Sequence, residues 1–125
     1  MTRLLLDTHV FLWWRMDDPR LTQPLRAAVA EAELVFVSVA SAWEVAIKMA
    51  LGRLRLPDCF ETGVVDSGFE RLLLTFAHAE GAGRLPVHHS DPFDRMLVAQ
   101  AQAEGLTLVT HDRRLAPYDV DVLWT

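Results

Sequence analysis

The chain has 125 residues, of which 51% are hydrophobic and 23% charged, and this is the composition of a folded globular protein rather than a disordered or fibrous one. The formal net charge of −5 argues against a generally basic, nucleic-acid-coating surface, although a local strip of arginines is compatible with it. The single cysteine, Cys59, excludes an intramolecular disulfide and a zinc site built on thiolates. The length predicts a single domain over residues 1–125.

Membrane and export signals are not expected in this sequence. Met1 is followed almost directly by an apolar strand pattern, which leaves no room for the regions of a signal peptide. No apolar stretch approaches the length of a membrane span. We therefore expect a soluble cytoplasmic protein.

The first predicted element is the apolar run Leu4 to Leu6, which ends at Asp7. Three branched apolar residues next to a polar pair predict a short strand that is buried on both faces, as in a parallel sheet. A carboxylate at the end of such a strand lies at the carboxyl edge of the sheet, where open α/β sheets bind ligands. Because a buried carboxylate needs a partner to offset its desolvation, Asp7 is the first candidate for chemistry.

Apolar spacing, caps and turn residues predict the elements that follow. Further strands are expected over residues 34–37, 69–74, 106–109 and 120–124. Helices are expected over residues 9–16 and 25–32, from a cap at Ser38 or Ser41 to Gly52, within 58–67, from Thr75 to about Gly83, and from Asp91 to Gly105. This alternation predicts an α/β fold, with a short parallel sheet of about four to five strands and helices on both faces.

Three more acidic residues fall at places comparable to that of Asp7: Glu44 and Asp94 near the starts of predicted helices, and Asp112 just after a predicted strand. In a parallel sheet these places share one edge, so the four carboxylates can converge. Converging carboxylates repel one another unless a cation neutralises them, and oxygen ligands without His or Cys favour Mg²⁺ or Mn²⁺. Such a site can activate water for phosphodiester hydrolysis.

Each of these three also has a purely structural explanation, which the sequence leaves open. Glu44 has capping-box spacing from Ser41 and is four residues before Lys48. Asp91 before Pro92 has the pattern of a helix N-cap, and the helix dipole favours an acidic residue such as Asp94 in the first turn. Asp112 can cap a short turn that begins at Arg113.

The histidines, tryptophans and arginines point less clearly to a function. The five histidines lack zinc-ligand spacing, although His89 and His111 are close in sequence to the acidic positions. Trp13, Trp14 and Trp43 are expected in the core rather than as a base-stacking platform. Four tryptophans in a small chain suggest more apolar surface than one core can bury, which favours a protein partner or a homodimer. Phosphate contacts are possible for Arg53, Arg55, Arg84, Arg95, Arg113 and Arg114.

The order of these blocks resembles PIN-domain proteins, and most of all the VapC toxins of bacterial VapBC toxin–antitoxin systems. The resemblance covers essentially the whole chain and rests on five blocks in order: residues 4–9 (LLLDTH), 41–48 (SAWEVAIK), 51–54 (LGRL), 91–101 (DPFDRMLVAQA) and 110–112 (THD). The combination is specific, although no single block would be.

The resemblance implies a PIN-like three-layer fold and a Mg²⁺- or Mn²⁺-dependent endoribonuclease with an acidic quartet. The four acidic positions match Asp7, Glu44, Asp94 and Asp112, of which Asp7, Asp94 and Asp112 would hold the metal. Support of the metal site would come from Thr8, Ser41 or Thr110, with Asp91 as a reserve candidate. Among the arginines, Arg95 and Arg113 are the preferred candidates for phosphate contacts. The resemblance further implies an RNA substrate, a homodimer and a cognate VapB antitoxin.

Two other functions remain open at this point. The fold could serve as a catalytically silent binding module for a protein partner, with the acidic cluster as an anchor for a basic peptide. A phosphohydrolase or phosphoacceptor that uses Asp7 as nucleophile is a weaker alternative, because such enzymes more usually offer a second Asp two residues on and position 9 is His.

Overall fold

In a computed structural model, which describes residues 2–125, five strands form one parallel sheet. Its order is β3-β2-β1-β4-β5, so the first strand lies in the middle with its neighbours paired to it on both sides. The prediction of a short parallel sheet of about four to five strands is confirmed. The strands are β1 (Arg3–Leu6), β2 (Leu34–Ser38), β3 (Glu70–Leu72), β4 (Thr107–Thr110) and β5 (Val122–Trp124).

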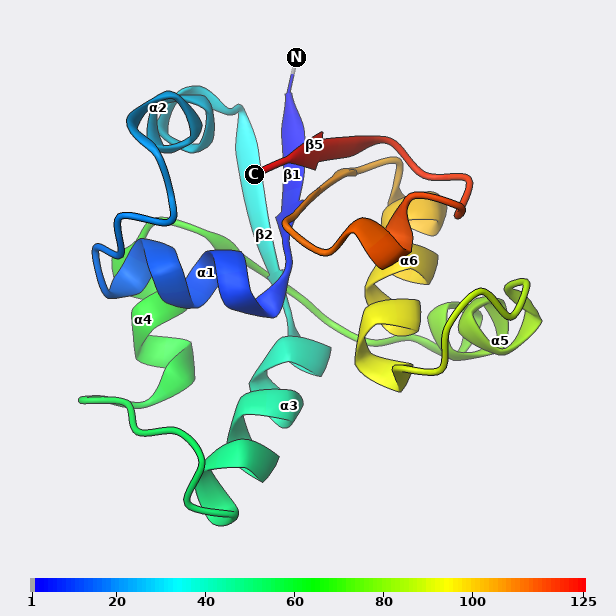
Figure 1. The fold of residues 1–125 in the computed structure, drawn as a ribbon, viewed down its shortest axis with the longest axis horizontal. Helices are drawn as coiled ribbons and strands as arrows, with labels where there is room; N and C mark the ends of the chain where they lie inside the picture. Colours follow the sequence, from blue (N-terminus) through cyan, green and yellow to red (C-terminus); the bar gives the residue numbers. More distant parts are fainter. Residues whose placement is uncertain (1) are drawn as a thin grey trace.

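Helices cover both faces of this sheet, which makes the three layers that were predicted (Figure 1). One face carries α1 (Thr8–Arg15), α2 (Gln23–Glu31) and α4 (Phe60–Asp66), and the other carries α5 (Phe76–Arg84) and α6 (Pro92–Glu104). The third helix, α3 (Val39–Ala50), leaves the carboxyl end of β2 and extends beyond the sheet. A short 3₁₀ turn, η1 (Arg113–Leu115), follows β4.

The central strand is buried on both faces because its side chains alternate between two hydrophobic cores. Leu4 and Leu6 pack with Phe11 and Trp13 of α1, whereas Leu5 packs on the opposite side with residues of α5 and α6. All three leucines are essentially inaccessible to water. The backbone that carries Asp7 is therefore anchored from both sides of the sheet.

Polar caps start the helices that follow the carboxyl ends of strands. The side chain of Asp7 accepts a hydrogen bond from the backbone of α1, and Ser38 does the same for α3. Asp91 caps α6 and Asp112 caps η1, as predicted. The capping box of Ser41 with Glu44 is wrong, because the helix begins earlier, at the Ser38 cap.

One of the three tryptophans expected in the core lies outside it. Trp13 is buried and Trp14 is partly buried, but Trp43 is 61% exposed. The helix that carries Trp43, α3, extends beyond the sheet, and the Trp43 ring packs against Phe93 in an edge-to-face arrangement. Within residues 2–125, no helix is long and apolar enough to cross a membrane.

Candidate active site

Asp7 is a buried carboxylate at the end of β1, and its polar neighbours hold it in place. Its Oδ1 accepts the backbone N–H of Val10 at 2.9 Å, and its Oδ2 accepts the hydroxyl of Thr110 at 2.5 Å. Burial is the largest influence on this group and raises the pKa of Asp7 above its ordinary value, although the two hydrogen bonds act in the opposite direction. Asp7 is thus oriented by donors from both α1 and β4.

Glu44 lies in α3 and is held on both of its carboxylate oxygens. Thr8, the first residue of α1, donates to Oε1 at 2.7 Å and also lies 2.9 Å from the hydroxyl of Ser41. Lys48 donates to Oε2 at 2.9 Å, which confirms the predicted i,i+4 pair. Glu44 is buried, so these partners offset the loss of its hydration.

Asp94 is the carboxylate on which the acidic residues converge. It lies in the first turn of α6, and its side chain is 18% exposed. Burial comes first among the causes that raise the pKa of Asp94 to about 7, and the charges of Asp91, Asp7, Asp112 and Glu44 follow in that order. Four acidic residues from separate parts of the chain therefore act on one carboxyl group.

Asp112 follows β4 and pairs with an arginine. Arg114 Nη2 lies 2.6 Å from Asp112 Oδ2 and 3.9 Å from Asp94 Oδ2. The Arg114 hydrogen bonds lower the pKa of Asp112 below its ordinary value. This guanidinium is largely exposed, so it is a solvent-screened positive charge at the edge of the acidic cluster.

The supporting residues of the sequence analysis separate into different groups. Thr110 donates to Asp7, whereas Thr8 and Ser41 form a separate buried group with Glu44. Asp91 uses its Oδ1 to cap α6 through the backbone N–H groups of Phe93 and Asp94. The negative charge of Asp91 also raises the pKa of Asp94.

Arg95, a predicted contact for a substrate phosphate, is engaged by groups of the protein itself in this structure. Its guanidinium donates to the backbone carbonyls of Ala82, Leu85 and Pro86 and to the hydroxyl of Tyr118. An arginine with these contacts fixes the end of α5 and has few donors left for a ligand. Arg113 is exposed, and its guanidinium lies over the Trp124 ring at 4.4 Å.

The oxygen-rich donor set suits a hard divalent cation better than zinc or copper. The mutual influence of the carboxylates on Asp94 is the electrostatic situation that such a cation relieves. As the side chains lie, however, no group of three or more His, Cys, Asp or Glu residues within 2–125 is arranged so that it could hold a metal ion. Asp7, Glu44 and Asp112 are instead engaged by hydrogen-bond donors of the protein, whereas Asp94 Oδ2 lies 3.5 Å from His89 Nε2 and 3.9 Å from Arg114 Nη2. Binding of a metal ion therefore requires side-chain rotation, which is easiest for Asp112 and Asp94 because they are partly exposed.

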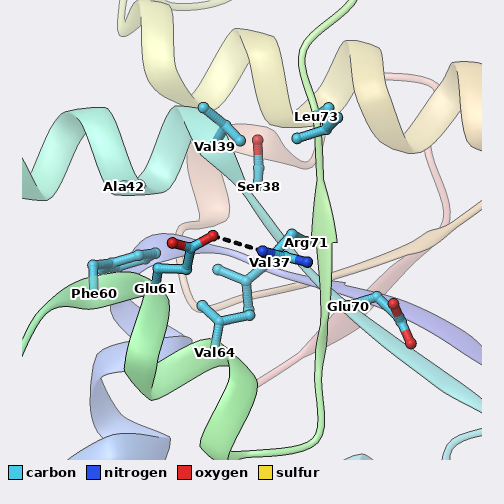
Figure 2. A pocket seen from close by; sticks show the side chains of 10 residues that line it. All are labelled: Val37, Ser38, Val39, Ala42, Phe60, Glu61, Val64, Glu70, Arg71 and Leu73. Atoms are coloured by element: carbon cyan, nitrogen blue, oxygen red, sulfur yellow. Dashed lines mark hydrogen bonds and ion pairs between the residues drawn. The ribbon is translucent and has the colours of Figure 1, made fainter.

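Two hollows differ in their relation to this cluster. One of about 340 Å³ is lined by both Asp7 and Asp112, together with His9, Trp13, His111, Arg113 and Arg114. A larger one of about 570 Å³ lies between the start of α3, α4 and β3 (Figure 2). Glu61 and Arg71 form a 2.7 Å ion pair across the larger hollow, and none of the four predicted acidic residues lines it. Of these two hollows, the smaller one exposes two of the predicted acidic residues, Asp7 and Asp112.

Two residues near the cluster were not singled out by the sequence. Arg114 was one of six arginines with no reason to prefer it, and only the fold brings it to Asp94 and Asp112. His89 was noted for its closeness in sequence to Asp91 and Asp94, but its burial beside Asp94 Oδ2 was not foreseen. In the sequence, only the position of His89 two residues before the Asp91 cap of α6 indicated that it could lie near Asp94.

Known proteins agree with this fold and this order of residues. The chain is 33% identical over 118 residues to ribonuclease VapC22 of Mycobacterium tuberculosis, which covers 92% of this chain and 91% of that protein. Among solved structures it is similar to VapBC2 from Rickettsia felis bound to a DNA fragment from its promoter, with a TM-score of 0.75, 13% identity and 99% of both chains covered. A toxin–antitoxin complex from Klebsiella pneumoniae gives a TM-score of 0.68 at 19% identity, covering 96% of this chain and 95% of that one. The family model of the PIN domain matches residues 4–121, and the chain therefore belongs to the PIN domain family.

Proposed function

We propose that this protein is a VapC-type toxin, a metal-dependent endoribonuclease that hydrolyses phosphodiester bonds in RNA and is neutralised by a VapB-type antitoxin. The proposal is supported above all by the electrostatics of Asp94, whose pKa is raised by burial and by the charges of Asp91, Asp7, Asp112 and Glu44. The relative that is 33% identical is a ribonuclease by name, and similar solved structures are VapBC complexes, which supports the same function.

Asp7, Asp94 and Asp112 are the proposed ligands of Mg²⁺, for which Mn²⁺ can substitute. When bound, this cation would neutralise charge on the reacting phosphate oxygens and lower the pKa of a water molecule. Glu44, held by Thr8 and Lys48, would accept a hydrogen bond from the attacking water and orient it.

The remaining residues of the site hold these groups in place or face the substrate. Thr110 and the backbone of Val10 fix the orientation of Asp7 before substrate arrives, which avoids a reorganisation cost during reaction. Arg113 and Arg114 are exposed beside the smaller hollow and can contact phosphates of an RNA strand.

A protein partner is part of this proposal. Several large apolar side chains are exposed near the start of α3 and around the β3–α5 connection, including Trp43, Leu73 and Phe76. Exposed apolar groups of this size favour coverage by another chain. We propose a VapB-type antitoxin and a second copy of this chain as the partners, and RNA as a substrate favours action in the cytoplasm.

The proposal is tested by cleavage of total cellular RNA by the purified protein with Mn²⁺ or Mg²⁺, with excess chelator, and with the variants Asp7→Asn and Asp94→Asn. We expect the wild type to cleave RNA only when the metal is present. Asp7→Asn and Asp94→Asn should stay folded but should not cleave RNA. Asp119→Asn serves as a matched control because Asp119 is exposed and lies outside the acidic cluster. Full activity of both folded variants, or activity in chelator, would refute the proposal. A protein that binds its partner tightly without any cleavage would instead be the binding module.

A further inference from the structure

His89, in the loop between α5 and α6, has a buried side chain that lies against Asp94. Its side chain is 8% exposed, and its Nε2 lies 3.5 Å from Asp94 Oδ2. That distance is too long for a hydrogen bond. Nε2 is one of two buried side-chain nitrogen or oxygen atoms in residues 2–125 that lack a hydrogen-bond partner. Because buried polar atoms nearly always have partners, this nitrogen is available to bond with the neighbouring Asp94 carboxylate.

The other ring nitrogen of His89 belongs to a hydrogen-bonded chain. Its Nδ1 lies 2.9 Å from the hydroxyl of Tyr118, and Arg95 Nη1 donates to the same hydroxyl at 3.2 Å. A guanidinium can only donate, so the Tyr118 oxygen accepts from Arg95 and its own proton is available for His89 Nδ1. With Nδ1 accepting, the proton of the neutral imidazole lies on Nε2, which faces Asp94.

The chain that sets this tautomer is rigid. Arg95 also donates to the carbonyls of Ala82 and Leu85, so its position is fixed by the end of α5. Tyr118 is buried, and the His89 ring packs edge-on against it with ring centroids 5.4 Å apart. Donation from the Tyr118 hydroxyl to Nδ1 favours the tautomer whose Nε2–H points toward the Asp94 carboxylate.

We propose that His89 is a positioning residue for Asp94, and that its Nε2–H donates to Asp94 Oδ2 when the carboxylate turns to bind the divalent cation. The inference rests on the proposed function, because Asp94 is a proposed metal ligand. A rotation of the partly exposed Asp94 side chain that shortens this 3.5 Å separation would form the hydrogen bond. Donors to metal-ligating carboxylates fix the ligand orientation and raise metal affinity.

Calorimetric titration of Mn²⁺ alone, without RNA, tests the inference on the full chain. We expect His89→Leu, which removes the donor, to weaken Mn²⁺ binding by about 10- to 100-fold. His89→Gln should retain most of the affinity, because its amide can donate from a similar position. His88→Leu is the matched control, since His88 is exposed and packs on the same Tyr118 ring, and it should bind Mn²⁺ like the wild type.

A second measurement decides the matter even if His89→Leu does not fold. Nitrogen chemical shifts of the His89 ring should report the Nε2–H tautomer in the wild type. Tyr118→Phe should reduce the population of that tautomer and weaken Mn²⁺ binding together. A wild-type ring protonated on Nδ1, or a folded His89→Leu with wild-type Mn²⁺ affinity, would overturn the role of His89 alone. A wild type that binds no Mn²⁺ would overturn the metal site as well.

Discussion

Replacement of Asp94 by Asn should stabilise the protein at neutral and alkaline pH in the absence of divalent metal, and the size of the effect should depend on pH. Burial and neighbouring carboxylates raise the pKa of Asp94 from 3.8 to about 7. Between these two values the folded protein keeps a proton that the unfolded chain has lost, so stability falls as pH rises through this window.

The full shift of the Asp94 pKa corresponds to about 4 kcal/mol. Because the Asp94 side chain is 18% exposed, solvent screens part of the cost of ionising it. The expected loss of free energy of unfolding at pH 8 is therefore about 2–4 kcal/mol. Asn carries no charge at any pH, so Asp94→Asn avoids this penalty. The variant should therefore be more stable than the wild type by that amount at pH 8 and nearly equal to it near pH 4.

The assay is urea unfolding followed by tryptophan fluorescence, for wild type and Asp94→Asn, at several pH values from 4 to 8 in chelator. The difference in free energy of unfolding should grow up to about pH 7 and then level off. Asp119→Asn, at an exposed position, controls for the general effect of removing one negative charge. A difference that is the same at all pH values, or an Asp94→Asn variant that is less stable at pH 8, would refute the electrostatic reasoning.

Three other substitutions test separate parts of the structure. Thr110→Val leaves Asp7 Oδ2 without its donor and should destabilise the fold by about 1–3 kcal/mol at pH 7 in urea unfolding. Thr110→Ser keeps the hydroxyl and should retain most of the stability, so equal stability of the Val and Ser variants would contradict the role of the hydroxyl. Arg114→Ala removes a positive charge beside Asp94 and Asp112, so Mn²⁺ affinity in a calorimetric titration should rise while thermal stability stays the same. Weaker Mn²⁺ binding by this variant would show that the guanidinium does not compete with the cation. Arg95→Ala should lower the free energy of unfolding by about 2–3 kcal/mol, because three backbone carbonyls and the Tyr118 hydroxyl lose a charged donor. Arg95→Lys should recover little of this free energy, because an ammonium group lacks the planar, forked set of donors of a guanidinium. Full recovery by Arg95→Lys would contradict that explanation.

The sequence predicted the features that depend on local pattern. The apolar run before Asp7, the Asp91 cap ahead of Pro92 and the pair of Glu44 with Lys48 follow from neighbours a few residues away. Such patterns gave the sheet, the order of elements and four acidic candidates, because strand ends and helix starts of a parallel sheet share one edge.

Features that depend on packing between distant parts of the chain could not be predicted in the same way. Trp43 was expected in the core as a large apolar residue, but α3 extends beyond the sheet and Trp43 is exposed. Arg95 follows the acidic Asp94 directly, yet its guanidinium is used by carbonyls of α5 and the following loop. The burial of His89 likewise depends on Tyr118, which is 29 residues further along the chain.

Binding of Mn²⁺ to the wild type and to Asp7→Asn, measured by calorimetry at pH 8 with both proteins verified as folded, tests most directly whether these carboxylates form one cation site. Asp7 is held by Thr110 and by the backbone of Val10, so its replacement by the near-isosteric Asn removes charge with little change of shape. We predict saturable binding to the wild type and its loss in the variant. Equal binding by both proteins, or no binding by either, would contradict a metal site at the carboxyl edge of β1.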